Sequence, residues 1–160
     1  MKDLYIVLEF RGKYRWLSNF HEVPIEFEGN TYQSTESAYQ AAKCANIEDR
    51  ALLYSNPSMT SADSKRIGSS VKLRDDWTEE LRLKTMYKLN RQKFLNNADL
   101  AKKLIATGEA ILMEGNLWGD TFWGVDLKTG IGDNHLGRIL MEIRFELMAE
   151  EVGLLSSLMV

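Results

Sequence analysis

The most regular pattern of apolar and polar positions lies in the second half of the chain. Apolar residues recur at helical spacing over residues 83–94, with Asn90 as the only polar member of the stripe. Asp76 stands three residues before Glu79, which predicts a capping box at the start of this helix. A second stripe begins at about Leu136 and predicts a final helix with one face in a core.

Shorter helices are predicted elsewhere by their end signals. Ser34 is a plausible N-cap for an Ala-rich helix over residues 36–45. Ser61 is placed to cap a short helix that stops before Gly68. Residues 99–107 also have a helical pattern.

Strand patterns are few and short. Residues 5–10, 25–27 and 110–113 are predicted strands, and Gly29 lies in a turn after the second of them. Residues 115–134 are rich in glycine and aromatic residues and show no regular period, which predicts a long ordered loop. The pattern therefore predicts an α+β fold that is predominantly helical, in one compact domain over residues 1–160.

Composition narrows the class of protein. The chain has 160 residues and a formal net charge of −3, so we expect no broad nucleic-acid surface. The single cysteine, Cys44, excludes an internal disulfide and a cysteine-rich zinc site, and it is expected to be a small buried residue. Neither a signal peptide nor a bilayer-spanning run is evident, so we expect a cytoplasmic protein that does not bind membranes.

The helix predicted over residues 36–45 carries the first group of candidate functional residues. Glu36, Tyr39, Gln40 and Lys43 are spaced i, i+3, i+4 and i+7, so they share one face. The face is either part of a functional site or a solvated surface stripe with a weak ion pair.

The glycine-aromatic loop carries the second group. Asp120 and Asp126 flank Trp123 and Gly124, which offer carboxylates, a stacking face and close backbone approach to a ligand. The alternative is a loop that is packed by its own aromatic residues. The segment around Asn134 leads into a helix N-terminus, where it is either an anion site or simply an N-cap. The two histidines have no metal-ligand spacing, so no metal site is expected.

These segments together resemble the NADAR (YbiA-like) family, in the order in which that family has them and over nearly the whole chain. The matching segments are residues 16–20, 32–36, 39–43, 73–74 with 77, 86, 93–94, 107–108, 114, 120, 123–124, 132–137, 140–141 and 144. Two departures stand out. The family usually has histidine where this chain has Ser37, and residues 125–127 replace a more glycine-rich continuation.

The resemblance implies a YbiA-like fold and a metal- and cofactor-independent N-glycosidase, a hydrolase that cleaves a bond between ribose C1 and a base nitrogen. The implied substrates are ribosylamino-pyrimidine phosphates of riboflavin biosynthesis or a single ADP-ribosylated guanine base. Two alternatives stay open. One is a non-catalytic module that binds ADP-ribose or a related nucleotide. The other is an interaction protein that docks through the apolar tail at residues 154–160.

Cleavage of an N-glycosidic bond builds positive charge on the ribose, which carboxylates can stabilise. Glu36 and Asp120 are the expected catalytic pair, with their acid and base roles unassigned. Lys43 is either a phosphate or hydroxyl ligand or a nucleophile that forms a Schiff base with C1. The expected substrate-binding residues are Asn19, Tyr39, Arg74, Trp123, Gly124 and Asn134. Among them, Trp123 would stack on the base and Arg74 would bind phosphate.

Overall fold

The computed structural model describes residues 5–158, without the side chains of residues 154–156. Two compact units make up the chain. The central unit is Ser18–Lys93, and the terminal unit combines Met1–Leu17 with Phe94–Val160. The predicted single domain over residues 1–160 stays a prediction. Among the described residues, no helix is long and apolar enough to cross a membrane.

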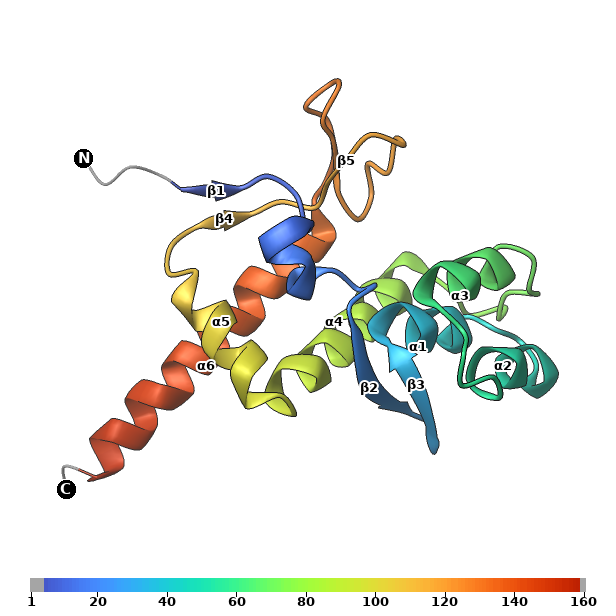
Figure 1. The fold of residues 1–160 in the computed structure, drawn as a ribbon, viewed down its shortest axis with the longest axis horizontal. Helices are drawn as coiled ribbons and strands as arrows, with labels where there is room; N and C mark the ends of the chain where they lie inside the picture. The colour runs from blue at the N-terminus through green and yellow to red at the C-terminus, as the bar shows by residue number, and fades with distance from the viewer. Residues whose placement is uncertain (1–4, 159–160) are drawn as a thin grey trace. The chain divides into compact units, whose positions relative to one another are not determined.

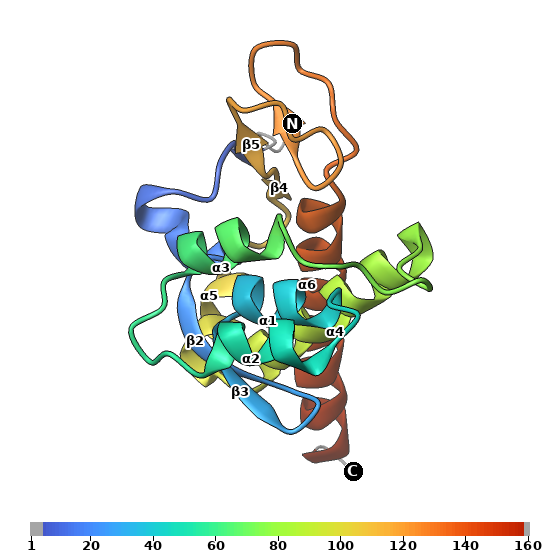
Figure 2. The same ribbon diagram turned by 90° about the vertical axis from the view of Figure 1, so that its right-hand side faces the viewer.

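The central unit is a β-hairpin packed with helices (Figures 1 and 2). Its elements are β2 (Glu22–Phe27), β3 (Asn30–Ser34), α1 (Thr35–Ala42), α2 (Ile47–Tyr54), α3 (Ser61–Gly68) and α4 (Glu79–Leu95), whose last two residues belong to the terminal unit. The antiparallel hairpin turns through Glu28 and Gly29, which have φ of 46° and 83°. A two-residue turn with two positive φ angles matches the twist of the strands.

Helix α1 is the core of the central unit, because it packs against β2, β3, α2 and α3. The Ser34 side chain accepts a hydrogen bond from Ser37 N, which confirms the predicted N-cap. All eight residues of the helix are buried. Ala38, Ala41 and Ala42 let the neighbouring elements approach closely, since alanine adds only a methyl group to the helix surface.

Several predicted helix ends were wrong. Asp76 does not cap α4, because its carboxylate pairs with Arg74, and the hydroxyl of Thr78 instead accepts from Leu81 N at 3.2 Å. The cap of α3 is Thr60, in a reciprocal capping box with Asp63. The helix predicted over residues 36–45 ends at Ala42, and α2 and β3 were not predicted at all.

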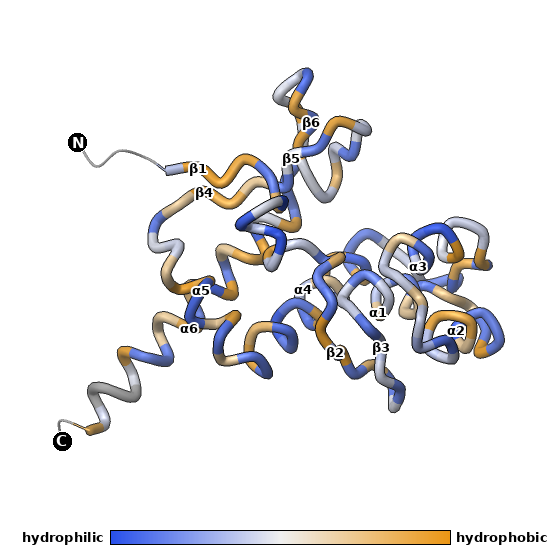
Figure 3. Tube along the Cα trace, in the orientation of Figure 1, coloured by the Kyte–Doolittle hydropathy of each residue, from blue (hydrophilic) through white to orange (hydrophobic). Residues whose placement is uncertain are grey.

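The terminal unit combines the N-terminal segment with the second half of the chain. Its elements are β1 (Ile6–Val7), the 3-10 helix η1 (Gly12–Leu17), α5 (Ala98–Ala106), β4 (Ile111–Leu112), β5 (Gly115–Asn116), β6 (Val125–Asp126) and α6 (His135–Leu158). Strands β1 and β4 are parallel partners and consist of apolar residues (Figure 3). The predicted stripe of α6 is buried throughout, at Leu136, Ile139, Leu140, Ile143 and Leu147. The tail at residues 154–160 lies partly outside the described residues.

The glycine-aromatic loop is more regular than predicted. Strands β5 and β6 pair in parallel at its base, and backbone bonds join residues 121–124 to residues 133–136. A Cβ on Gly124 would lie 2.0 Å from the Glu114 carbonyl oxygen, so only glycine permits this approach of two backbones. The predicted α+β, predominantly helical fold is confirmed, although the strand predicted over residues 5–10 shortens to Ile6–Val7.

Candidate functional site

The face of α1 that carries the candidate residues is buried. Glu36 is 8% exposed, Tyr39 and Gln40 are 6% exposed, and Lys43 is half-buried. Gln40 Nε2 donates to Glu36 Oε1 at 2.7 Å, which fixes one carboxylate oxygen. The alternative of a solvated surface stripe was therefore wrong. A carboxylate in such a position is uncommon unless it is compensated or functional.

The backbone around Glu36 is anchored through Asn19. Glu36 N donates to Asn19 O at 3.0 Å, at the start of α1. The Asn19 amide oxygen accepts from Asn90 Nδ2 at 3.1 Å, and Lys93 Nζ donates to Ser18 O at 2.9 Å. Two residues of α4 thus hold the segment that carries Asn19. The observed contacts of Asn19 position Glu36, whereas substrate contact by Asn19 stays a prediction.

Three buried side-chain oxygen atoms of the central unit have no hydrogen-bond partner among the described residues. They are Thr35 Oγ1, Gln40 Oε1 and Asn90 Oδ1. The amide nitrogen of Gln40 donates to Glu36, and the amide nitrogen of Asn90 donates to Asn19. Unsatisfied buried acceptors are rare in folded proteins, and a bound ligand is one way in which they are satisfied. Asn90 was missed as a site residue, although its position as the only polar residue of an apolar stripe was a signal.

Lys43 is the last residue of this face and occupies the C-cap position of α1. Desolvation lowers the pKa of the Lys43 amine, and nearby Arg82 and Lys65 lower it further. Glu36 opposes this shift by favouring the ammonium form, but burial is the largest cause and the net direction is downward. The shift favours a neutral, nucleophilic amine, and the same group of cations is suited to an anionic substrate.

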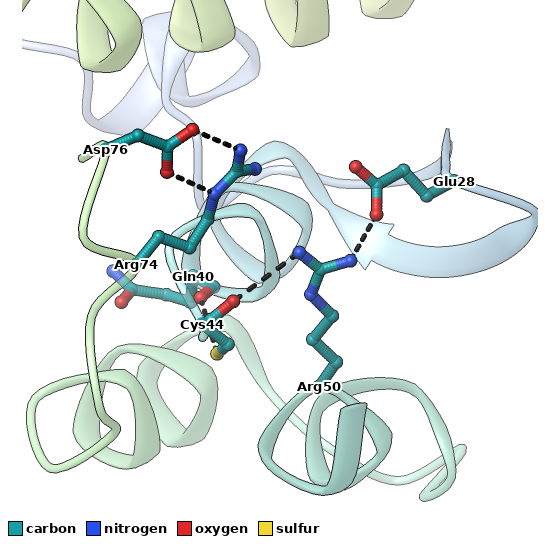
Figure 4. A network of polar contacts seen from close by, with 6 residues as sticks. All are labelled: Glu28, Gln40, Cys44, Arg50, Arg74 and Asp76. Carbon is teal, nitrogen blue, oxygen red and sulfur yellow. Dashed lines mark hydrogen bonds and ion pairs between the residues drawn. The ribbon is translucent and has the colours of Figure 1, made fainter. Parts of the chain in front are cut away.

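The other predicted residues of the central unit have definite partners. The Tyr39 ring packs against Trp77 with centroids 5.6 Å apart. The Arg74 guanidinium grips Asp76 through two bonds of 2.8 Å, which raises the pKa of Arg74 and lowers that of Asp76 (Figure 4). A phosphate at Arg74 would compete with this carboxylate.

Figure 4 shows polar contacts at the end of α1. Cys44 Sγ donates to Gln40 O at 3.2 Å, and burial raises the pKa of the thiol. Arg50 donates to Cys44 O at 3.4 Å and to the carboxylate of Glu28. The prediction that Cys44 is a small buried residue is confirmed, since its side chain is fully buried.

Ser37, which replaces the usual family histidine, belongs to a buried cluster of hydroxyl groups. Its Oγ lies 2.8 Å from Ser64 Oγ on α3 and 3.1 Å from Ser34 Oγ. Ser61 Oγ donates to Ser34 Oγ at 2.8 Å. The departure at Ser37 is therefore a packing feature between α1 and α3.

In the terminal unit, Asp120 is held in a fixed orientation. Its Oδ1 accepts from Trp123 N at 2.9 Å and Phe122 N at 3.2 Å. Asn116, which is buried, bonds to both the N–H and the carbonyl of Asp120. The second carboxylate oxygen of Asp120 takes part in neither backbone bond.

The aromatic residues beside Asp120 form a group of their own. Phe122 packs edge-on against Trp123 at 4.8 Å and lies 4.6 Å from the His135 ring. These contacts match the alternative of a loop packed by its own aromatics, although Trp123 remains partly exposed.

The side chain of Asn134 is hydrogen-bonded to the backbone of the terminal unit. It has φ of 52°, and its side chain accepts from Glu114 N at 3.0 Å and donates to Leu112 O at 2.9 Å. Both ends of the amide are thus used within the protein. Among residues 5–158, no three His, Cys, Asp or Glu side chains cluster as metal ligands would.

A family model described as the NADAR domain matches residues 9–148. The chain belongs to the NADAR domain family. The family predicted from the sequence is thus confirmed.

Two of the named relatives of this chain are N-glycosidases. The N-glycosidase YbiA of Shigella flexneri is 36% identical over 134 residues, which cover 84% of this chain and 82% of that protein. The N-glycosidase Npun_R5314 of Nostoc punctiforme is 32% identical over 137 residues, with 84% and 86% covered. A riboflavin biosynthesis protein of Vibrio vulnificus is 36% identical over 136 residues, but this chain spans only 35% of its length. The predicted enzyme class, N-glycosidase, is confirmed at the level of these relatives.

The fold agrees with a solved NADAR relative. The NMR structure of Escherichia coli YbiA aligns with a TM-score of 0.81 at 33% identity and covers 95% of this chain and 89% of that one. In this NADAR chain, the central unit holds Glu36, Lys43, Asn19, Tyr39 and Arg74, and the terminal unit holds Asp120, Trp123, Gly124 and Asn134. Joint action of Glu36 and Asp120 stays a prediction.

Proposed function

We propose that this chain hydrolyses the bond between ribose C1 and the nitrogen of a base, with Glu36 as a catalytic residue. The supporting observation is the burial of Glu36, held by Gln40 on α1 and accompanied by buried acceptors that have no partner among the described residues. Substrate hydroxyl or N–H groups would satisfy such acceptors. Names of N-glycosidase relatives support the same reaction class.

In the proposed reaction, the C1–N bond breaks and its electron pair stays on the base nitrogen, which takes up a proton from a protonated carboxyl group. A water oxygen bonds to C1 and gives its proton to a carboxylate. An ionised carboxylate also stabilises the positive ribose in the transition state. We assign these roles to Glu36 and Asp120, whose backbone-held carboxylate is suited to a fixed geometry.

Lys43 supports a second route to the same products. A neutral amine attacks C1 of the ring-opened sugar, displaces the base nitrogen, and forms a Schiff base that water then hydrolyses. The downward shift of the Lys43 pKa favours this route.

The proposed substrate is a ribosylamino-pyrimidine phosphate. Arg82 and Lys65 lie close enough to Lys43 to lower its pKa, and these two cations would attract a phosphate to the buried face. The riboflavin biosynthesis name of the Vibrio relative supports this choice. An ADP-ribosylated guanine, which also carries phosphates, is the second candidate.

A turnover assay tests the proposal without added metal. Purified protein is offered a ribosylamino-pyrimidine phosphate and an ADP-ribosylated guanine oligonucleotide in parallel, and the products are identified by mass spectrometry. Release of free base with ribose phosphate, or of free ADP-ribose, supports the activity and selects the substrate. Tight binding without product from either would overturn the proposal in favour of a nucleotide-binding module.

Substitution of Glu36 tests its catalytic role. Glu36→Gln keeps an acceptor for Gln40 but removes the charge and the proton-transfer group, so we expect turnover to fall by about 100-fold or more. Glu48→Gln is the control, because Glu48 also lies in the first turn of a helix, α2, but is exposed. Near-wild-type turnover of a folded Glu36→Gln variant would contradict the assignment.

A further inference from the structure

A short basic stretch stands apart in this acidic chain. Arg11, Lys13 and Arg15 are exposed, and residues 10–21 contain no acidic residue between Glu9 and Glu22. Arg11 lies just before η1, Lys13 is near its start and Arg15 is in its last turn. Positive charge is therefore concentrated locally, although the formal net charge of the chain is −3.

Aromatic rings are interleaved with these cations. The Arg11 guanidinium lies over the Trp118 ring, 5.4 Å from its centroid, and the Lys13 ammonium lies over the Tyr14 ring at 4.9 Å. Tyr14 is hydrogen-bonded through its hydroxyl to the hydroxyl of Tyr5. Tyr14 N donates to Arg11 O at 2.9 Å, so both cations and Tyr14 lie within one turn of the backbone. Three segments of the terminal unit thus contribute to one surface.

The rings of this surface reach solvent. Trp118 is 56% exposed and Tyr5 is 52% exposed. Exposed aromatic rings provide stacking faces that accept any nucleobase, and a guanidinium plane can continue such a stack. Cations within reach of the same rings would meet the phosphates that join successive bases.

Lys13 carries a positive charge at physiological pH, because its pKa lies above the ordinary value of 10.5. Tyr14 and, to a smaller extent, Tyr5 raise the pKa of Lys13. Asp120 is the acidic residue closest in sequence to Trp118, and its Oδ1 is occupied by backbone N–H groups of residues 122 and 123.

We propose that Arg11, Lys13, Arg15, Trp118, Tyr5 and Tyr14 form a binding surface for a short stretch of single-stranded nucleic acid. Three cations match about three phosphates, so the surface is narrow and agrees with the expected absence of a broad nucleic-acid surface. The alternating order of cations and rings favours a strand over a lipid surface, where an amphipathic element separates an apolar face from a charged one. Strand binding goes beyond the proposed glycosidase activity and does not depend on it.

Binding of a labelled single-stranded oligonucleotide of about 12 nucleotides, followed by fluorescence anisotropy from 25 to 250 mM salt (roughly the range over which phosphate contacts respond), tests the proposal. We expect the logarithm of the affinity to fall with the logarithm of the salt concentration with a slope of about −2. Lys13→Gln should make that slope shallower by about 0.7. Trp118→Ala should weaken binding by about tenfold at constant salt, through lost stacking.

Lys102→Gln is the matched control, since Lys102 is an exposed lysine of α5 in the same unit and lies outside the surface. Its slope should equal that of the wild type. Arg11→Gln provides a second variant should Trp118→Ala fail to fold.

Three results would overturn the proposal. The first is the absence of oligonucleotide binding at 25 mM salt, which is about the most favourable condition. The second is an equal loss of oligonucleotide affinity in Lys102→Gln and Lys13→Gln. The third is binding to phosphatidylserine vesicles without binding to the oligonucleotide. Turnover of the small-molecule substrate by Trp118→Ala is measured in parallel. If this variant still turns over the small-molecule substrate, a failure of strand binding does not affect the glycosidase proposal.

Discussion

At the scale of single residues, burial gives two ordinary side chains of α1 unusual properties. Glu36 is almost excluded from water, in a helix turn where the backbone N–H groups favour a negative charge. Lys43 loses part of its hydration in the same unit, and its pKa falls. An acid and an amine on one buried face match what a glycosidic bond requires of a catalyst.

Reductive trapping of Lys43 should depend on pH. Only the neutral amine forms a Schiff base, and the lowered pKa makes this form available at a lower pH than for an ordinary lysine. The yield of borohydride-trapped adduct should therefore rise as the pH increases through the lowered pKa, below the ordinary value of 10.5. Mass spectrometry locates the adduct. Lys43→Arg should abolish it and Lys88→Arg, at an exposed position of α4, should not. An unchanged adduct in Lys43→Arg would exclude the Schiff-base route at this residue.

The hydrogen bonds of Ser37 lead to a separate prediction about the free energy of unfolding. Its hydroxyl is bonded to Ser34 and Ser64 in a buried cluster, so Ser37→Ala should reduce the free energy of unfolding by about 1–2 kcal/mol. Turnover should stay near wild type, since the cluster packs α1 on α3. Urea unfolding and the turnover assay measure the two effects, with Ser58→Ala as an exposed control. A large loss of turnover without loss of stability would instead make Ser37 part of the catalytic machinery.

At the scale of elements, α1 functions through the helices and the hairpin around it. Helix α3 ends at Gly68, where a Cβ would lie 1.9 Å from Gln40 Oε1. Helix α4 holds Asn19, which in turn receives the Glu36 N–H. The position of the Glu36 carboxylate is therefore determined by contacts from two other helices.

Gly68→Ala should impair turnover more than stability. The added methyl meets the flexible end of Gln40, which can move away, but that movement breaks its hydrogen bond to Glu36. We expect turnover to fall by about tenfold, as for the loss of roughly 1.4 kcal/mol of transition-state stabilisation. Gly153→Ala on α6, where the added Cβ would meet none of the described residues beyond its own turn within 4 Å, should leave turnover unchanged. Equal turnover in the two variants would contradict a positioning role for Gln40.

At the scale of the whole molecule, the candidate catalytic residues come from both compact units. Glu36 belongs to the central unit and Asp120 to the terminal unit. Each carboxylate is oriented by hydrogen bonds within its own unit, from Gln40 and from the Trp123 N–H, respectively.

A double-mutant cycle tests whether the two carboxylates act in one mechanism. Residues that act as a catalytic unit are strongly non-additive, so Glu36→Gln with Asp120→Asn should be little slower than the slower single variant. Independent sites would instead multiply their effects. Single-turnover rates of the three variants decide between these outcomes, and multiplied effects would contradict the two-carboxylate scheme.

The sequence alone determined the helical stripes, the Ser34 cap and the family, because each depends on local spacing or on an ordered set of short motifs. Tertiary structure decided what those signals left open. The face of α1 is buried because α3 and the hairpin cover it, and a helical period alone cannot tell a functional face from a solvated one. Asp76 lost its predicted cap role because Arg74 offered its carboxylate a stronger partner. Asn90 stood out in the sequence only as a polar residue in an apolar stripe, and its part in the site followed from its contact with Asn19, which lies 71 residues away in the chain and is brought close by the fold.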